Sequence, residues 1–330
     1  MPDRELMPDN VRVDQLDQAI DAILTGAPSP DDPELAALAR IAGRLRDLPD
    51  ENFQKRLKSD LQRRAAMSTS AVAPIREGFR TITPYIAVPN APELIDFLKR
   101  TFGAQELVAH PIPGGGFHAE VKIGDSILMI GGGEAARGHE RIGAFHVYVP
   151  DCDTTYNRAM EAGATSVGAP SDHHYGERAG YVKDAAGNDW YIATHLGATP
   201  ALESRWMVTP FVHPVSVPKY IDFLTRAFGA TKLALYEDAG RVVYAAVQIG
   251  DAVLEMGEPH EAPAPARAGF YLYVEDCDAV YQRAIEAGAT SLWPPADQPY
   301  GDRTAGLVDP FGHQWFPATH IPSRQINDVR

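Results

Sequence analysis

The feature that most constrains this chain is an internal duplication. Three motifs recur 126 residues later, where Thr83-Pro-Tyr-Ile becomes Thr209-Pro-Phe-Val, Ile95-Asp-Phe-Leu becomes Ile221-Asp-Phe-Leu and Ile123-Gly-Asp becomes Ile249-Gly-Asp. Further along the offset is 125, as in the pair Glu161-Ala-Gly-Ala-Thr-Ser and Glu286-Ala-Gly-Ala-Thr-Ser. Motifs that recur in one order and at nearly one spacing indicate repeated structural units. We therefore expect two homologous domains, at 80–197 and 206–322.

Each copy is predicted to contain two smaller units of the same kind. Residues 81–88 alternate like a strand, and residues 92–101 carry apolar side chains at helical spacing. Two further strands, 117–123 and 126–130, are joined by Gly124-Asp125, a strong hairpin signal. The pattern then restarts with a strand over 144–149 and a helix over 151–162. The order is β-α-β-β-β, twice per domain, which predicts an α+β fold.

The part of the chain that precedes the duplication has a different character. Residues 1–67 contain three stretches with apolar residues at helical spacing, which predicts a small all-α segment. Residues 68–79 are small and polar like a linker, and residues 323–330 are expected to form a frayed tail. The helices would form a layer on the main domains or on a second subunit, a dimerisation arm that makes a homodimer, or a partner-binding element.

Charge and composition restrict the function classes. Acidic side chains outnumber basic ones 44 to 30, and the net charge of −14 argues against a nucleic-acid partner, because phosphates require a basic surface. No apolar run approaches the roughly 18 residues of a membrane span, so no membrane association is expected. The N-terminus lacks the apolar stretch of a signal peptide and the chain has 2 cysteines, which predicts a cytoplasmic location.

The modules resemble the vicinal-oxygen-chelate superfamily, whose members include glyoxalase I, extradiol dioxygenases and bleomycin-resistance proteins. The resemblance rests on the tandem modules, on Phe102-Gly-Ala after the first helix and on Asp309-Pro-Phe-Gly-His-Gln-Trp in the last hairpin. Within the superfamily, the run from His118 to Met129 and the motif Tyr300-Gly-Asp-Arg look most like the PhnB-like subgroup. The resemblance implies two tandem domains of paired modules, whose mixed, curled sheets surround a cleft.

The resemblance also implies where a divalent metal would be bound, on the first and last strand of each module. Carried over to this sequence, those positions fall on Thr83, Met129, Ala144, Tyr191, Thr209, Glu255, Gly269 and Phe316. Only Glu255 is a strong ligand, and a lone carboxylate does not hold a divalent cation. A metal cofactor is therefore not favoured, and the cofactor stays unknown. A shift of two residues would bring His146 to one of these positions.

Three polar residues of the first domain are candidate catalytic groups. His118 and Glu120 share one face of a strand, and His146 lies on an alternating strand whose polar side faces the expected cleft. The corresponding residues of the second copy are Tyr244, Ala246 and Tyr271. This asymmetry predicts an active first domain and a second domain that acts as a scaffold. The alternative interpretation is structural, with an exposed polar strand and a hydrogen-bonded wall histidine. The candidate metal ligands are His118, Glu120, His146 and Glu255.

A further group of side chains is expected to contact a ligand. Its aromatic members are Tyr85, Tyr191, Phe211, Tyr244, Tyr271 and Phe316. Arg178 and Arg303 follow a Tyr-Gly-acidic motif in the two copies. Each arginine would either clamp an anionic group through its bidentate fork or tie its loop down through the adjacent acid, Glu177 or Asp302.

Two functions of different classes follow. The first is a small-molecule-binding protein of the glyoxalase and bleomycin-resistance type that has largely lost the usual metal-ligand positions, with an acidic surface that favours a neutral or cationic ligand. The alternative is an enzyme of the lyase, isomerase or dioxygenase type, metal-assisted or metal-free, with its active site in the first domain. The sequence leaves open whether the chain is an enzyme, and whether modules pair within or between domains.

Overall fold

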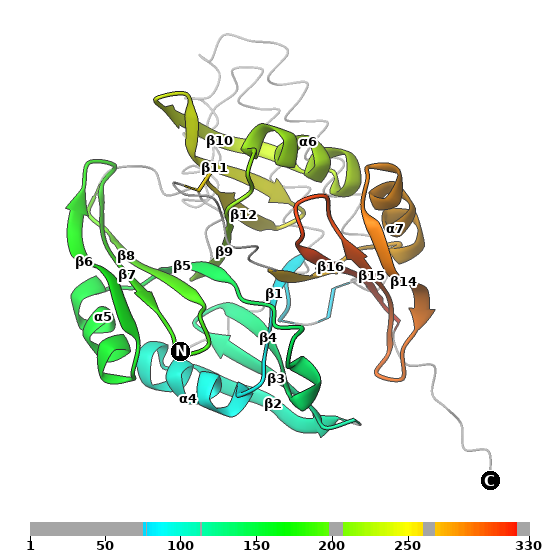
Figure 1. Cartoon of the computed structure of the whole chain (residues 1–330), viewed down its shortest axis with the longest axis horizontal. Coiled ribbons are helices and arrows are strands. Elements are labelled where there is room, and N and C mark those ends of the chain that lie inside the picture. The colour runs from blue at the N-terminus through cyan, green and yellow to red at the C-terminus, as the bar shows by residue number, and fades with distance from the viewer. Residues whose placement is uncertain (1–74, 77, 113, 198–206, 260–267, 322–330) are drawn as a thin grey trace, which may run out of the picture. The chain divides into compact units, whose positions relative to one another are not determined.

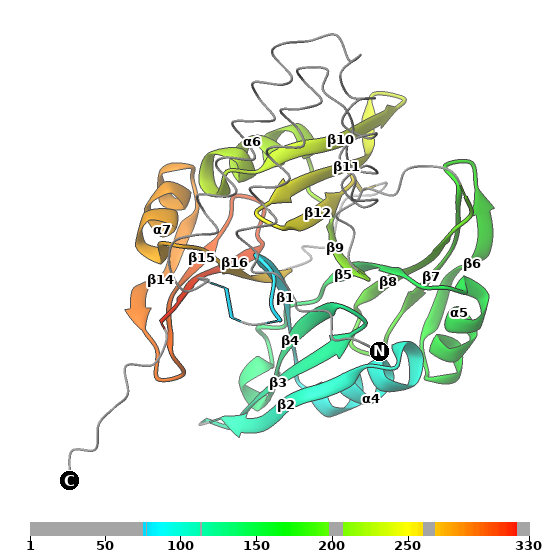
Figure 2. The same cartoon turned by 180° about the vertical axis from the view of Figure 1, so that it is seen from behind.

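The structure is a computed structural model that describes residues 75–76, 78–112, 114–197, 207–259 and 268–321. The predicted N-terminal helical segment and the predicted tail lie outside these residues, as does most of the predicted linker. None of the described helices is both long and apolar enough to cross a membrane. Figures 1 and 2 show the described strands and helices from opposite sides.

The two copies of the duplication contain the same order of strands and α-helices. The first contains β1 (Ile82–Val88), α4 (Ala91–Phe102), β2 (Gln105–Ile112), β3 (Gly116–Ile123), β4 (Ser126–Gly133), η1 (Glu134–Ala136), β5 (Ala144–Tyr148), α5 (Cys152–Glu161), β6 (Thr165–His173), β7 (Glu177–Lys183) and β8 (Asp189–His195). The second contains β9 (Val208–Val212), α6 (Val217–Phe228), β10 (Thr231–Asp238), β11 (Arg241–Ile249), β12 (Ala252–Met256), β13 (Gly269–Tyr273), α7 (Cys277–Glu286), β14 (Thr290–Asp297), β15 (Asp302–Val308) and β16 (Gln314–His320). The α+β prediction and the modular order are confirmed.

Local sequence explains where the helices begin and end. Helix α4 has a proline in its first turn, where no backbone donor is lost, and ends at Gly103 with φ of 67°, a conformation that favours glycine. Helix α5 begins at Asp151, whose side chain accepts a hydrogen bond from the Thr154 N–H. Asp276 caps α7 in the same way. The repeated motifs therefore specify the same local structure twice.

The strands form two eight-stranded sheets, and each sheet combines the two copies. Sheet A has the order β14-β15-β16-β13-β1-β4-β3-β2, and sheet B has the order β10-β11-β12-β9-β5-β8-β7-β6. The joins are antiparallel, with Thr83 opposite Tyr271 between β1 and β13 and His146 opposite Thr209 between β5 and β9. The first module of each copy thus pairs with the second module of the other copy.

The two larger hydrophobic cores follow the copies rather than the sheets, whereas a smaller cluster on sheet A combines residues of both copies, such as Met129 and Tyr271. One core contains Leu94, Leu98 and Trp190 and belongs to the first copy apart from Val208. The other contains Phe223 and Trp315 and belongs to the second copy apart from Ile82. Side chains alternate along a strand, so the residues between these core positions point away from the helices. We call this opposite side face A on sheet A and face B on sheet B.

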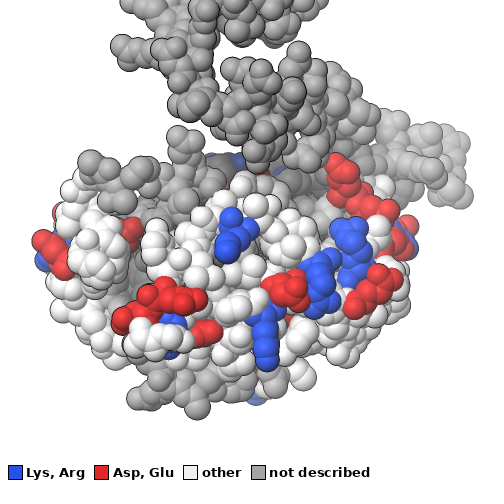
Figure 3. All heavy atoms as spheres, turned by 90° about the horizontal axis from the view of Figure 1, so that it is seen from above, with Lys and Arg blue, Asp and Glu red and all other residues white. Residues whose placement is uncertain are grey.

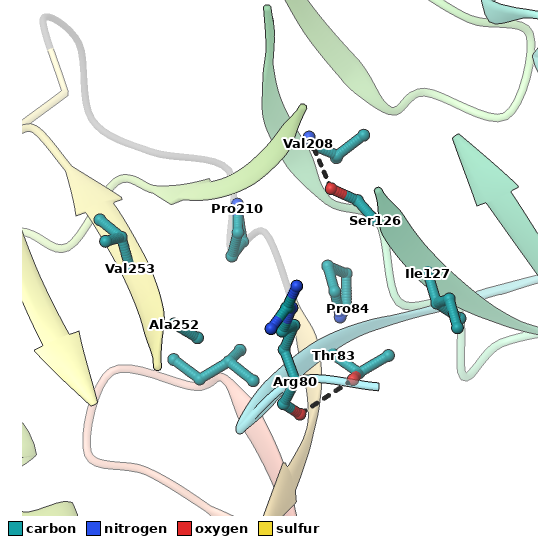
Figure 4. A pocket seen from close by; sticks show the side chains of 10 residues that line it. Arg80, Thr83, Pro84, Ser126, Ile127, Val208, Pro210, Ala252 and Val253 are labelled. Atoms are coloured by element: carbon teal, nitrogen blue, oxygen red, sulfur yellow. Dashed lines mark hydrogen bonds between the residues drawn. The ribbon is translucent and has the colours of Figure 1, made fainter. Parts of the chain in front are cut away.

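Two aspartates in repeated turns fasten the copies to each other. The Asp125 carboxylate accepts a hydrogen bond from the Met207 N–H at 2.9 Å, and Ser126 Oγ accepts one from the Val208 N–H at 3.0 Å. In the repeat, the Asp251 carboxylate accepts from the Thr81 N–H at 2.9 Å. The close-up in Figure 4 shows this junction, where a pocket is lined by residues of both copies, among them Thr83, Pro84, Ser126, Val208 and Pro210. Each turn therefore holds the first strand of the other copy.

Replacing Asp125 or Asp251 with alanine is expected to lower the free energy of unfolding by about 1 kcal/mol each, because a backbone donor loses a charged acceptor. Urea unfolding of the single and double variants measures this. The control is Asp222→Ala, whose exposed ion pair with Arg226 lies within one helix and should change stability by less than about 0.5 kcal/mol. Losses no larger than the control's would contradict the role of these turns.

Candidate functional site

Face B brings together a histidine, a glutamate and a tyrosine from both copies. His146 Nδ1 lies 2.7 Å from Glu255 Oε2, and the Tyr244 hydroxyl donates to Glu255 Oε1 at 2.8 Å. The Glu255 side chain is fully buried, and that of His146 is 16% exposed. A carboxylate can only accept, so the His146 nitrogen donates to it. The pair therefore fixes both the orientation of the imidazole and the proton on Nδ1.

Aromatic rings surround this polar group. The Phe211 and Tyr191 ring centres lie 6.2 and 5.7 Å from that of His146, and Tyr181 stacks on Tyr191 at 4.5 Å. The Tyr191 hydroxyl lies 3.1 Å from His213 Nε2, and His213 Nδ1 lies 3.2 Å from the Gly257 carbonyl. Burial, followed by the charge of Asp189, raises the pKa of Tyr191 to about 12. The tyrosine is thus a neutral donor near pH 7.

Strand register explains why these residues meet. Glu255 lies opposite Phe211 where β12 pairs with β9, and His146 lies opposite Tyr191 where β5 pairs with β8. On β9 the residue beside Glu255 is therefore Phe211, and on β5 the residue beside Tyr191 is His146. These residues lie two positions beyond Thr209 and Ala144. Across the join between β5 and β9, His146 lies opposite Thr209 and Ala144 lies opposite Phe211.

The equivalent positions of face A carry different side chains. Met129 lies opposite Tyr85, and Phe316 lies opposite Tyr271. The Tyr271 hydroxyl donates to Asp302 at 2.8 Å, and His320 Nδ1 lies 2.8 Å from the same carboxylate. Burial, with Tyr300 and Asp302 nearby, raises the pKa of Tyr271. Face A thus has tyrosine and methionine where face B has His146 and Glu255.

The second predicted pair, His118 and Glu120, lies on face A and is tied to an arginine that precedes β1. Arg76 donates twice to Glu120, at 2.5 and 2.9 Å, while His118 Nε2 lies 3.4 Å from the same side chain. Burial alone would raise the pKa of Glu120, but the hydrogen bonds from His118 and Arg76 bring it below its ordinary value of 4.5. This arrangement makes Glu120 a buried ion-pair partner.

The predicted trio of His118, Glu120 and His146 is not assembled. The first two lie on β3 in sheet A, whereas His146 lies on β5 in sheet B and pairs with Glu255 of the second copy. The expectation that these three residues act together in one site is thus corrected. Its physical reason is the exchange of modules, because each face takes half of its side chains from each copy.

Arg178 and Arg303 hold their loops, through acids other than the predicted ones. Arg178 binds Asp153 of α5 and Asp172 of β6 at 2.5–2.8 Å. Arg303 makes the same contacts with Asp278 and Asp297. The adjacent acids Glu177 and Asp302 point to the other side of their strands. Glu177 accepts a hydrogen bond from Tyr148, and Asp302 accepts hydrogen bonds from Tyr271 and Tyr273. The predicted tie through the neighbouring acid is therefore wrong.

The donor set does not fit a divalent metal of the kind the family resemblance implies. A catalytic divalent ion is usually held by three protein ligands. Of the implied positions on this sheet, which carry Ala144, Tyr191, Thr209 and Glu255, only Glu255 is a strong ligand, and the nearby His146 is hydrogen-bonded to it. Within the described ranges, no group of three or more His, Cys, Asp or Glu side chains could hold a metal ion. Of the four candidate metal ligands, His146 and Glu255 therefore meet on face B, whereas His118 and Glu120 lie on face A.

The two cysteines are buried and occupy equivalent positions at the start of α5 and α7. Cys152 Sγ donates to the Ile192 carbonyl at 3.1 Å, and Cys277 Sγ to the Pro317 carbonyl at 3.3 Å. Burial raises their pKa values to about 11 and about 12. Neither thiol is suited to be a nucleophile, which needs the thiolate.

Several residues of both faces were not singled out from the sequence. Arg76 and Arg141 contact face A from connecting segments, and their neighbours in sequence give no periodic signal. Tyr148 shares the alternation of His146 and could have been found from it, since it lies two residues along the same strand. Figure 3 shows described acidic and basic side chains side by side on one molecular face.

Comparison with known proteins identifies the relatives of this chain. The model of the Glyoxalase/Bleomycin resistance protein/Dioxygenase superfamily matches residues 79–192 and 215–316. CFP32 of Mycobacterium bovis, provisionally named a glyoxylase, is 26% identical over 213 residues, which is 62% of this chain and 80% of CFP32. An uncharacterized protein of Mycobacterium tuberculosis H37Rv is 30% identical over 143 residues, or 40% of this chain and 83% of that protein.

Solved structures share the fold. Glyoxalase I from Zea mays superposes with a TM-score of 0.59 at 15% identity, covering 73% of this chain and 92% of that one. A provisionally assigned dioxygenase from Bacillus subtilis gives a TM-score of 0.50 at 14% identity, covering 74% of this chain and 87% of the other. At these identities the similarity concerns the fold alone.

Replacing Glu120 with glutamine should lower the free energy of unfolding by about 1–2 kcal/mol near pH 7, a figure reduced for the partial exposure of Arg76. The folded-state pKa of Glu120 lies below its ordinary 4.5, so its contribution is present above pH 4.5 and is lost as the pH falls through the lowered value. Urea unfolding across this range should show the difference between the two proteins shrinking. A difference independent of pH would contradict the ion pair.

Proposed function

The chain belongs to the glyoxalase, bleomycin-resistance protein and dioxygenase superfamily, and on that premise we propose that it binds a small molecule on face B. The observation that carries this proposal is the buried Glu255, held by His146 and Tyr244 beneath a wall of aromatic rings. The two copies supply this group jointly. Binding sites of this kind combine apolar walls with a few fixed polar groups.

The side chains of face B favour a ligand with a flat apolar body and a cationic or hydrogen-bond-donating group. Tyr191 and Phe211 offer ring faces, which attract both aromatic surfaces and cations. Glu255 supplies a carboxylate whose position is fixed by two donors. A fixed negative charge close to aromatic faces recognises an amine better than a carboxylate. The ligand class is therefore a neutral or cationic aromatic compound.

The binding is proposed to be metal-independent, because the set of ligand types around Glu255 on face B is incomplete. Two ligands that already hydrogen-bond to each other would have to separate before they could share an ion. A divalent ion would also need donors from positions that carry Tyr191 and Phe211. We therefore assign His146 and Glu255 to ligand recognition.

Elemental analysis tests this assignment. Protein purified without chelator or a nickel column should carry fewer than about 0.1 transition-metal ions per chain after dialysis against a chelator. The measurement is inductively coupled plasma mass spectrometry, with the Glu255→Gln protein as the matched control. About one Zn, Mn, Fe, Ni or Cu ion per chain that survives dialysis and disappears in Glu255→Gln would contradict metal independence.

The ligand class can be tested with simple probes. Isothermal titration with 2-naphthylmethylamine, cationic near pH 7, should show binding that weakens roughly tenfold in Glu255→Gln, because a charge-assisted contact is lost. The uncharged 2-naphthylmethanol should bind both proteins alike. Glu258→Gln, a carboxylate beyond the end of β12, is the control and should leave amine binding unchanged. Equal amine binding by wild type and Glu255→Gln would overturn the assignment.

A second function, an enzyme that transfers a proton without a metal, is favoured by the His146–Glu255 pair. An imidazole whose Nδ1 donates to a carboxylate is oriented to exchange a proton through Nε2, as in other histidine–carboxylate pairs. This proposal differs from simple binding in one respect. Replacing His146 with glutamine would abolish turnover of a ligand and leave much of its affinity, whereas a binding protein has no turnover to lose.

Other predictions from the sequence remain proposals. They are the domain limits 80–197 and 206–322, membership of the PhnB-like subgroup, a cytoplasmic location and a homodimer formed through the N-terminal helices. The net charge of −14 and the mixed charges in Figure 3 support the expectation that nucleic acid is not the partner.

A further inference from the structure

Face A contains an arginine that lies against a pair of aromatic rings in contact with each other. The Arg141 guanidinium lies 4.7 Å from the ring centre of Tyr85 and 5.3 Å from that of Phe316. Its Nη1 donates to the Gln314 side chain at 2.9 Å. The Arg141 backbone pairs with Ala87 through two hydrogen bonds of 2.9 and 3.0 Å, so the side chain starts from a fixed point beside β1. Such a guanidinium is oriented before any ligand arrives.

The acids of face A are committed to other groups. Glu120 is bound by Arg76 and His118. Asp302 accepts from Tyr271, Tyr273 and His320, all three on its own sheet.

Arg141, in contrast, donates to the neutral Gln314 side chain, and within the described ranges its Nε is buried without a hydrogen-bond partner. Burial lowers the pKa of Arg141, and the group that acts in the opposite direction is the Tyr85 side chain and not a carboxylate. A buried, uncompensated guanidinium is costly, and an anionic ligand would compensate it.

One end of face A is filled by the chain itself, which locates the remaining space. Phe79 packs against Tyr273 at 5.7 Å and is only 6% exposed. At the other end, Trp293 stacks on Phe316 at 5.6 Å with 19° between the rings and remains 41% exposed. Trp293 therefore offers exposed aromatic surface beside Phe316, the ring that Arg141 also contacts.

Two glycines allow the rings and the arginine to lie close to the sheet. A Cβ at Gly269 would come within 2.7 Å of Arg141 Cδ, and one at Gly131 would come within 3.0 Å of the Tyr85 hydroxyl. A larger residue at either position would displace the group above it. The arrangement of Tyr85 and Arg141 over β4 and β13 thus depends on these positions.

We propose that Arg141, which lies against Tyr85 and Phe316, is the anion-binding group of a second ligand site on face A, and that this site takes an aromatic carboxylate. A carboxylate conjugated to a ring is flat, so its oxygens can meet the guanidinium while the ring stacks on Trp293. The site is distinct from face B, where the fixed charge is the carboxylate of Glu255. The two sheets thus present sites of opposite charge preference.

Isothermal titration with 2-naphthoate and the uncharged 2-naphthamide tests the proposal. Wild type should bind naphthoate roughly tenfold more tightly than naphthamide, since the charge is the difference between the probes. Arg141→Gln should remove that preference. Arg137→Gln, an exposed arginine of the same loop that pairs with Glu134, is the matched control and should keep it. Trp293→Ala should weaken both probes to a similar extent.

Two further variants test whether a loss of naphthoate binding comes from misfolding or from binding on face B. Arg141→Lys keeps the positive charge and loses the planar fork, so naphthoate binding should fall by at least about threefold even if Arg141→Gln does not fold. Glu255→Gln should leave naphthoate binding unchanged. The proposal is overturned if wild type binds no naphthoate or binds both probes equally. It is also overturned if naphthoate binding is not weakened in any Arg141 variant that folds.

Discussion

The structure depends on the pairing of each copy's first strand with the other copy. β1 lies between β13 and β4, and β9 lies between β5 and β12, so both first strands are central in their sheets. Asp125 and Asp251 bind backbone donors at the start of these strands and fix where they enter. A central strand with hydrogen bonds on both sides cannot be removed without splitting its sheet. Neither sheet is therefore complete without residues from both copies.

This exchange has a chemical consequence, because it makes two faces that can diverge. On face B the exchange places His146 of one copy on Glu255 of the other. On face A the same exchange places Tyr271 near Met129, both in one apolar cluster with Phe316. Equivalent backbones therefore carry an acid–imidazole pair on one sheet and an aromatic group with Arg141 on the other. A duplicated fold can keep one architecture and acquire two ligand preferences.

Much of the fold could be predicted from sequence patterns, but only some of the contacts within the two faces could be. Alternation around Phe145 and Val147 predicted that His146 points away from the core, and the repeated Gly-Asp turns predicted two hairpins, at Gly124 and Gly250. Alternation along single strands does not say which strands become neighbours, so the partner of His146 was out of reach. The contacts of Arg178 with α5 depend on a helix 25 residues away. Arg141 lies in a connection without periodicity, where no pattern places a side chain.

The central claim is that His146 and Glu255, from different copies, act as one unit on face B. The most direct measurement is a double-mutant cycle on the free energy of urea unfolding, with His146→Ala, Glu255→Gln and the double variant. The account predicts a coupling of about 1 kcal/mol or more, as expected of residues in direct contact. A parallel cycle with His118→Ala and Glu255→Gln, which lie on different sheets, should be additive within about 0.5 kcal/mol. Additivity in the first cycle, or coupling in the second, would contradict the account.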